Sequence, residues 1–270
     1  MAKVWKFAGI ELYNEEDGKE WGKGMRYEEF TIEGRNAVLE AFRSGKTIDK
    51  LFILDGCKDG PVETIKREAK KHDCILRFVT KERLNQMSET GKHQGVIAYA
   101  AAYEYAQVED ILNLAKQKGE PPFILLLDNI EDPHNLGAII RTANLAGAHG
   151  VIIPKNRAAG LTAAVVRASA GALNYTPVAK VTNLAKTMED LKKQGLWFVC
   201  GDMDGTPMYK LDLRGPIGLV IGSEGEGVGR VVKKTCDFVA SIPMKGNIDS
   251  LNASVAAGVL AYEIVRQRMQ

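Results

Sequence analysis

The sequence predicts an α/β protein in which a parallel sheet in the C-terminal half follows a smaller α/β unit. Residues 123–128, FILLLD, form a continuous apolar run, which is typical of a strand covered on both faces of a parallel sheet. Five more strand candidates follow, with helical stretches between most of them, at residues 150–153, 175–181, 197–200, 218–221 and 238–242. Because such sheets bind ligands at the carboxyl ends of their strands, we expect a site at that edge.

The chain before residue 123 divides into three parts. Residues 1–24 form an extension of unknown role, without a clear period. Residues 25–103 alternate between helix and strand and are expected to form a compact unit, with helices at 34–42, 62–72 and 82–87 and strands at 50–54, 75–79 and 93–101. Residues 104–122 are charged, locally helical and end in two prolines, so we interpret them as a linker to a second domain at 123–270.

Composition excludes several classes of protein. The 36 Lys and Arg residues nearly balance the 34 Asp and Glu, so charge alone does not show what the protein binds. The four cysteines form no CxxC pair and the four histidines no metal-binding cluster, which favours a reduced cytoplasmic protein without a metal. Neither a signal segment nor an apolar run long enough to span a membrane is present, so we expect no membrane partner.

The first motif surrounds a helix after the strand at 123–128. Asp132 and Pro133 form a strong helix start, since aspartate caps free amides and proline is favoured at the first helical position. Asn135 and Arg141 lie off the apolar stripe of this helix, near the expected ligand site. From this segment alone, a first-turn asparagine and a solvated arginine are the favoured interpretation.

The second motif is GLVIGSEGEGVGR, at residues 218–230. A strand that runs into several glycines lets a ligand approach the backbone closely. The spacing is not the GxGxxG of dinucleotide-binding proteins, and the SGKT at residues 44–47 lacks the first glycine and the strand of a phosphate-binding P-loop. Asp202 and Asp204 are interpreted as a polar turn rather than a metal pair.

The third motif spans residues 241–268. A strand ends near Pro243, and Ser250 is predicted to cap a helix in which Asn252 is a first-turn polar residue. Apolar residues spread over much of the circumference of this helix, so it is expected either to be deeply buried or to form a subunit interface.

Together these segments resemble the three motifs of the SpoU (TrmH) family of RNA ribose 2'-O-methyltransferases. The matching blocks are the Asn135 and Arg141 pair, GSEG at residues 222–225 and IPMKGNIDSLN at 242–252, and the resemblance covers residues 123–268. EGRNAV at 33–38 and HQGV at 93–96 resemble the small, ribosomal-protein-like RNA-binding domain of RlmB-type 23S rRNA methyltransferases. Residues 1–24 match nothing in that family.

The resemblance implies a SPOUT-type sheet with a C-terminal trefoil knot that holds S-adenosylmethionine, and no metal. The implied cofactor-binding residues are Ile221, Gly222, Ile242, Met244, Leu251 and Asn252. The implied catalytic residues are Asn135, Arg141, Glu224, Ser250 and Asn252. Arg141 would either orient the ribose hydroxyl and a phosphate, or accept the proton after local activation.

The expected reaction is methyl transfer from S-adenosylmethionine to a ribose 2'-hydroxyl of RNA, with a 23S rRNA guanosine favoured. The alternatives are a tRNA ribose or another rRNA ribose, and a catalytically silent RNA-binding factor of ribosome assembly. A small-molecule α/β enzyme is disfavoured by the missing nucleotide-binding fingerprints. We expect a homodimer, because the helix after Ser250 is broadly apolar and the sites of this family are completed across two subunits.

Overall fold

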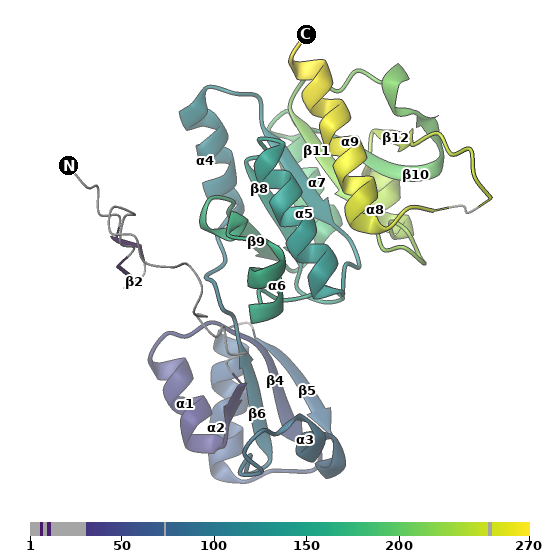
Figure 1. Ribbon diagram of the computed structural model, residues 1–270. Coiled ribbons are helices and arrows are strands. Elements are labelled where there is room, and N and C mark those ends of the chain that lie inside the picture. The colour runs from purple at the N-terminus through teal and green to yellow at the C-terminus, as the bar shows by residue number, and fades with distance from the viewer. Residues whose placement is uncertain (1–5, 8–9, 12–30, 73, 248–249) are drawn as a thin grey trace, which may run out of the picture.

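The computed structural model describes residues 6–7, 10–11, 31–72, 74–247 and 250–270 (Figure 1). Most of the extension expected at residues 1–24 lies outside these residues. Within it, β1 (Lys6–Phe7) and β2 (Ile10–Glu11) form an antiparallel pair. The remaining described residues form two sheets, one of four strands and one of six.

The N-terminal sheet has the order β3-β6-β4-β5, and only β4 and β5 are parallel. Its strands are β3 (Thr31–Glu33), β4 (Ile48–Leu54), β5 (Ile75–Val79) and β6 (Val96–Ala100). Alternate residues of β4, Leu51 and Ile53, are fully buried with apolar residues of α1 (Arg35–Arg43) and α2 (Gly60–Lys71). The short helix α3 (Lys81–Met87) contacts β4 and β6.

The C-terminal sheet is parallel throughout and has the order β12-β10-β11-β7-β8-β9. Its strands are β7 (Phe123–Leu127), β8 (Gly150–Pro154), β9 (Val178–Val181), β10 (Trp197–Pro207), β11 (Ile217–Ile221) and β12 (Phe238–Ser241). The α/β class and the parallel sheet predicted from the sequence are therefore confirmed. β7 lies inside the sheet, and all its residues are buried, which accounts for its continuous apolar run.

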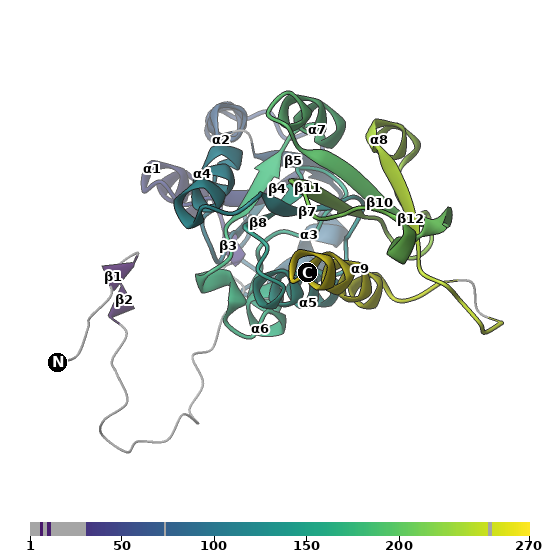
Figure 2. The same cartoon turned by 90° about the horizontal axis from the view of Figure 1, so that it is seen from above.

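Helices cover both faces of the C-terminal sheet (Figure 2). One face carries α5 (Pro133–Leu145), α6 (Ala163–Ala168) and α9 (Ala253–Arg268), which share a buried core with Leu125 and Leu127. The other carries α4 (Val108–Lys118), α7 (Leu184–Lys192) and α8 (Arg230–Thr235), which share a second core with Ile124 and Leu126. Two single turns of 3₁₀ helix, Ala172–Asn174 and Met208–Lys210, complete the unit.

Three local predictions differ from the structure. The segment interpreted as a linker contains α4, whose Ile111 and Ala115 are buried against the C-terminal sheet. The strand expected at 197–200 continues to Pro207, so Asp202 and Asp204 lie in β10 and not in a turn after it. The cap of α9 is Asn252 instead of Ser250: the Asn252 side chain accepts hydrogen bonds from the backbone N–H groups of Ser254 and Val255.

Candidate active site

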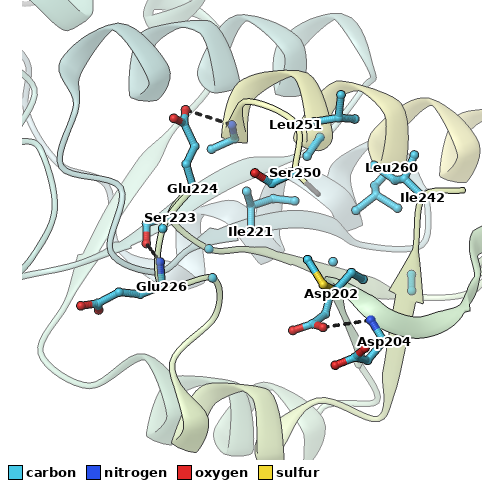
Figure 3. Close-up of a pocket in the computed structure, with 18 of the residues that line it drawn as sticks. Asp202, Asp204, Ile221, Ser223, Glu224, Glu226, Ile242, Ser250, Leu251 and Leu260 are labelled. Atoms are coloured by element: carbon cyan, nitrogen blue, oxygen red, sulfur yellow. Dashed lines mark hydrogen bonds between the residues drawn. The ribbon is translucent and has the colours of Figure 1, made fainter. Parts of the chain in front are cut away.

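A cavity of about 330 Å³ opens at the carboxyl ends of β10, β11 and β12 (Figure 3). The far half of β10, the turn after β11, the segment after β12 and the first turns of α9 form its walls. The lining residues are Gly201, Asp202, Met203, Asp204, Ile221, Gly222, Ser223, Glu224, Gly225, Glu226, Gly227, Lys233, Ala240, Ile242, Met244, Ser250, Leu251, Ala253, Ala256 and Leu260. The cavity therefore lies at the edge of the sheet where the sequence predicts a ligand site.

The turn after β11 depends on two glycines. Gly227 has a φ of 65°, a left-handed conformation that favours glycine, and its N–H donates to the Ser223 carbonyl at 2.9 Å. A Cβ atom on Gly222 would lie 2.1 Å from the Gly227 carbonyl carbon and 2.3 Å from the Val228 nitrogen. Since these contacts are with backbone, the turn closes this tightly only with glycine at position 222.

Three polar side chains from distant parts of the chain meet beside this cavity. The Asn135 amide donates to Glu224 Oε1 at 3.1 Å, and the Asn252 amide donates both to Asn135 Oδ1 at 3.0 Å and to Glu224 Oε1. The Ala253 N–H donates to the same Glu224 oxygen at 3.3 Å. We call Asn135, Glu224 and Asn252 the polar triad. The polar triad therefore joins the first turn of α5 to the cap of α9.

The site residues expected from the sequence fall into three groups in the structure. Seven of them line the cavity: Ile221, Gly222, Glu224, Ile242, Met244, Ser250 and Leu251. Asn135 and Asn252 reach it only through Glu224. Arg141 stands apart: it is exposed on α5, outside the cavity lining, and its side chain makes no hydrogen bond or ion pair within the described residues.

The cavity residues that were missed as site candidates include Asp202, Met203, Asp204 and Lys233. Lys233 Nζ forms an ion pair with Asp202 Oδ2 at 2.6 Å, and the Asp204 N–H donates to Asp202 Oδ1 at 3.1 Å. Burial alone would raise the pKa of Asp202, but the Lys233 and Asp204 contacts outweigh it and lower that pKa. The available signal was position, because Asp202 follows the apolar part of a strand at the ligand-binding edge.

Charge around the cavity is mainly negative. Asp202, Asp204, Glu224 and Glu226 face only one cationic side chain among the lining residues, that of Lys233. The net negative field favours a ligand that carries positive charge. Among the described residues, no group of three or more His, Cys, Asp and Glu side chains could hold a metal ion. No described helix is both long and apolar enough to cross a membrane.

Comparisons with known proteins show which family the sequence matches. The model of the SpoU rRNA Methylase family matches residues 122–262, and the model described as RNA 2'-O ribose methyltransferase substrate binding matches residues 31–106. YacO of Bacillus subtilis strain 168, named as a TrmH family tRNA/rRNA methyltransferase, is 49% identical over 236 residues, covering 87% of this chain and 94% of YacO. A Staphylococcus saprophyticus protein with the same family name is 46% identical over 242 residues, covering 89% and 97% of the two chains.

Solved structures extend the likeness to the fold. The SpoU methyltransferase AviRb from Streptomyces viridochromogenes in complex with AdoMet superposes with a TM-score of 0.57 at 26% identity, covering 89% of this chain and 90% of AviRb. The AdoMet-bound rRNA methyltransferase from Sinorhizobium meliloti superposes with a TM-score of 0.55 at 25% identity, covering 88% and 87% of the two chains.

Proposed function

The chain belongs to the SpoU rRNA methylase family and is an RNA methyltransferase that uses S-adenosylmethionine, and on this premise we propose that it methylates a ribose 2'-hydroxyl, at a guanosine of 23S rRNA. One observation carries the proposal: the tight turn after β11 and the start of α9 enclose one cavity, and the polar triad borders it. The name of the second matched family model supports a ribose as the acceptor and residues 31–106 as the RNA-binding part.

The cavity fits the cofactor in two respects. Its carboxylates complement a sulfonium cation, and glycine at position 222 lets the turn that forms one cavity wall close against Gly227 and Val228. We assign cofactor binding to Ile221, Gly222, Ile242, Met244 and Leu251, with Asn252 acting through the cap of α9. When bound, S-adenosylmethionine supplies a methyl group on a carbon already activated by the positive sulfur.

The protein then has to position the ribose and assist its hydroxyl. Glu224 accepts three hydrogen bonds through one oxygen and thereby holds the amide of Asn135 at the cavity edge. Ser250 lines the same wall and is proposed to contact the reacting groups. Arg141 is proposed to bind the hydroxyl or a neighbouring phosphate, since a guanidinium stays protonated and is a poor base.

The exposed position of Arg141 supports a homodimer. Because Arg141 lies away from the cavity of its own chain, we propose that it completes the site of a second copy. Leu145 on α5 and Val255 and Tyr262 on α9 are exposed apolar side chains on neighbouring helices, which suits a dimer interface. Sedimentation at micromolar concentration should show a dimer, and a monomer there would contradict both the interface and the shared site.

We also propose the C-terminal trefoil knot. Two features support it: β10 pairs with both β11 and β12, and the segments that follow β11 and β12 line the same cavity. A knotted C-terminal region brings these segments together without a further domain.

The decisive experiment is transfer of labelled methyl from S-adenosylmethionine to purified RNA. We expect 23S rRNA fragments to accept label, tRNA to accept none, and the labelled site to resist alkali, because a methylated 2'-hydroxyl cannot attack the adjoining phosphodiester. Label on tRNA alone would replace the proposed substrate, and label on a base would overturn the reaction. Binding of RNA and S-adenosylhomocysteine without transfer would identify a silent RNA-binding factor.

A further inference from the structure

A buried carboxylate lies where the N-terminal unit meets the C-terminal unit. Asp49, in β4, is only 4% exposed. Its Oδ1 accepts hydrogen bonds from the Tyr105 hydroxyl at 2.8 Å and from Lys180 Nζ at 2.5 Å. Lys180 belongs to β9 of the C-terminal sheet, and its ammonium also lies 4.7 Å from the centre of the Tyr105 ring. We call Asp49, Tyr105 and Lys180 the boundary cluster.

Both units hold the boundary cluster in place. The Tyr105 oxygen accepts from the Leu161 N–H at 3.0 Å, in the segment after β8. Burial and the negative Asp49 raise the pKa of the Tyr105 hydroxyl well above its ordinary value, so it remains a donor. A Cβ on Gly160 would lie 2.3 Å from Asp49 Oδ2, and this second oxygen has no hydrogen-bond partner within the described residues. The carboxylate is thus closely packed against Gly160, and a side chain at position 160 would displace it.

The segment that connects the two units, residues 101–106, forms backbone hydrogen bonds with both of them. The Ala101 N–H donates to the Thr47 carbonyl of the N-terminal unit at 2.9 Å. The next residue, Ala102, donates to the Leu161 carbonyl at 2.8 Å, and Ala106 donates to the Val178 carbonyl at 2.9 Å. The segment between the two sheets therefore binds to both of them at successive residues.

The boundary cluster shares an edge with the active site. Lys180, Gly160 and Leu161 lie at or after the carboxyl ends of β8 and β9, and the polar triad lies at the carboxyl ends of other strands of the same parallel sheet. Figure 1 shows the N-terminal unit beside this edge. A shift of the N-terminal unit would therefore change the distance between bound RNA and the cavity.

We propose that Asp49, through Lys180 and Tyr105, fixes the N-terminal unit relative to the methyl-transfer site and so selects which ribose of a structured RNA reaches it. The inference rests on the proposed function for its substrate, and it assigns Asp49 and Lys180 as positioning residues for specificity. A buried ion pair suits this task, because removal of one partner leaves the other charge unpaired and favours separation of the surfaces.

The test compares Asp49→Asn and Lys180→Met with the full-length wild-type protein. For a structured 23S rRNA fragment, each variant should raise KM by about tenfold or more, since the RNA-binding unit no longer presents its ligand at a fixed distance. For a short single-stranded RNA, which needs only the cavity, kcat and KM should stay unchanged, as should S-adenosylhomocysteine affinity. Small-angle scattering should show a larger radius of gyration for both variants.

Two further variants separate positioning from general damage. Lys180→Arg keeps the charge and should retain most of the wild-type KM. Asp190→Asn removes an exposed ion pair between Asp190 of α7 and Lys193, neither of which belongs to the boundary cluster, and should change neither readout. An unchanged scattering profile or an unchanged KM for structured RNA in both boundary variants would overturn the inference. If the wild-type protein transfers methyl to no RNA, the proposed function fails, and scattering alone then decides whether Asp49 fixes the unit.

Discussion

Substitution of Gly222 by alanine tests whether the turn after β11 builds the cofactor cavity. The new Cβ atom would start 2.1 Å from the Gly227 carbonyl carbon, whereas ordinary van der Waals contact begins at 3.4 Å. The two backbone segments would have to separate by about 1.3 Å. The clashing atoms belong to the backbone of Gly227 and Val228, so a change of side-chain rotamer cannot relieve the overlap.

The structural cost follows from this overlap. Overpacking a close-packed site costs about 1–3 kcal/mol, and we expect the upper end because backbone must move. A loss of about 3 kcal/mol lowers the Tm of a domain of this size by roughly 6–12 °C. The displaced segment also lines the cavity, so S-adenosylhomocysteine binding should be lost together with stability.

Thermal unfolding with and without S-adenosylhomocysteine measures both effects. At a ligand concentration about one hundred times its Kd, the wild-type protein should gain about 2.7 kcal/mol, and Gly222→Ala should gain none. Gly225→Ala is the matched control for stability, because a Cβ at this position in the same turn has nothing within 4 Å. If Gly222→Ala melts like the wild-type protein and shows the same ligand-dependent rise, the turn does not shape the cavity as described.

Three further predictions address other parts of the chain. Arg141→Ala should leave folding and S-adenosylhomocysteine binding intact but reduce the rate of single-turnover methyl transfer by about a hundredfold or more. Arg141→Lys should also lose methyl transfer, because an ammonium cannot replace the planar set of donors of a guanidinium. Near-normal transfer by the alanine variant would remove Arg141 from the mechanism. Residues 107–270 alone, which keep α4 on the C-terminal sheet, should bind S-adenosylhomocysteine as the intact chain does, since every cavity residue lies in this part. Calorimetry without heat would contradict this. Burial tends to raise the pKa of Glu33, but hydrogen bonds from Ser88, Thr90 and Glu89 lower this pKa to about 2. The ionised carboxylate therefore stabilises the fold fully at pH values above its ordinary pKa of 4.5, and this stabilisation is lost as pH falls towards 2. Glu33→Gln should therefore destabilise the protein more at pH 7 than at pH 3 in urea unfolding, and equal destabilisation at both would refute the assignment.

Local sequence patterns were sufficient to predict elements that depend on the burial of a strand or on one capping residue. The apolar run at 123–128 predicted β7, because a strand buried on both faces has no polar alternation. Asp132 and Pro133 predicted the start of α5, where the Asp132 carboxylate accepts from the N–H groups of His134 and Asn135. These features depend on neighbouring residues and are visible in a short window of sequence.

Features that depend on distant partners could not be predicted in this way. α4 buries only a narrow stripe, so its charged residues dominated the composition and suggested a linker. The far half of β10 is polar, and it is held by pairing with β12 after a register shift between Gly201 and Thr206. Ser250 and Asn252 are both good caps, and only the chain path around the cavity puts Asn252 at the helix start.

In the candidate site too, the contacts between residues distant in the sequence could not be predicted from local patterns. Asn135, Glu224 and Asn252 were named through the family resemblance, but their hydrogen bonds join residues 89, 28 and 117 positions apart. No local pattern indicates that one carboxylate oxygen joins the first turn of α5 to the cap of α9. Asp202 and Asp204 were set aside because a polar pair after an apolar strand is more often a turn.

The strand order of the C-terminal sheet has a consequence for synthesis of the protein. When β10 emerges from the ribosome, the place between it and β7 belongs to β11, which does not yet exist. The cavity itself is assembled from residues between Gly201 and Leu260 of a 270-residue chain. A nascent chain therefore has no means of holding the cofactor until α9 has been synthesised. Products shortened at the C-terminus by even the length of α9 should accordingly be inert, so a truncated copy would not release a partly active methyltransferase into the cell.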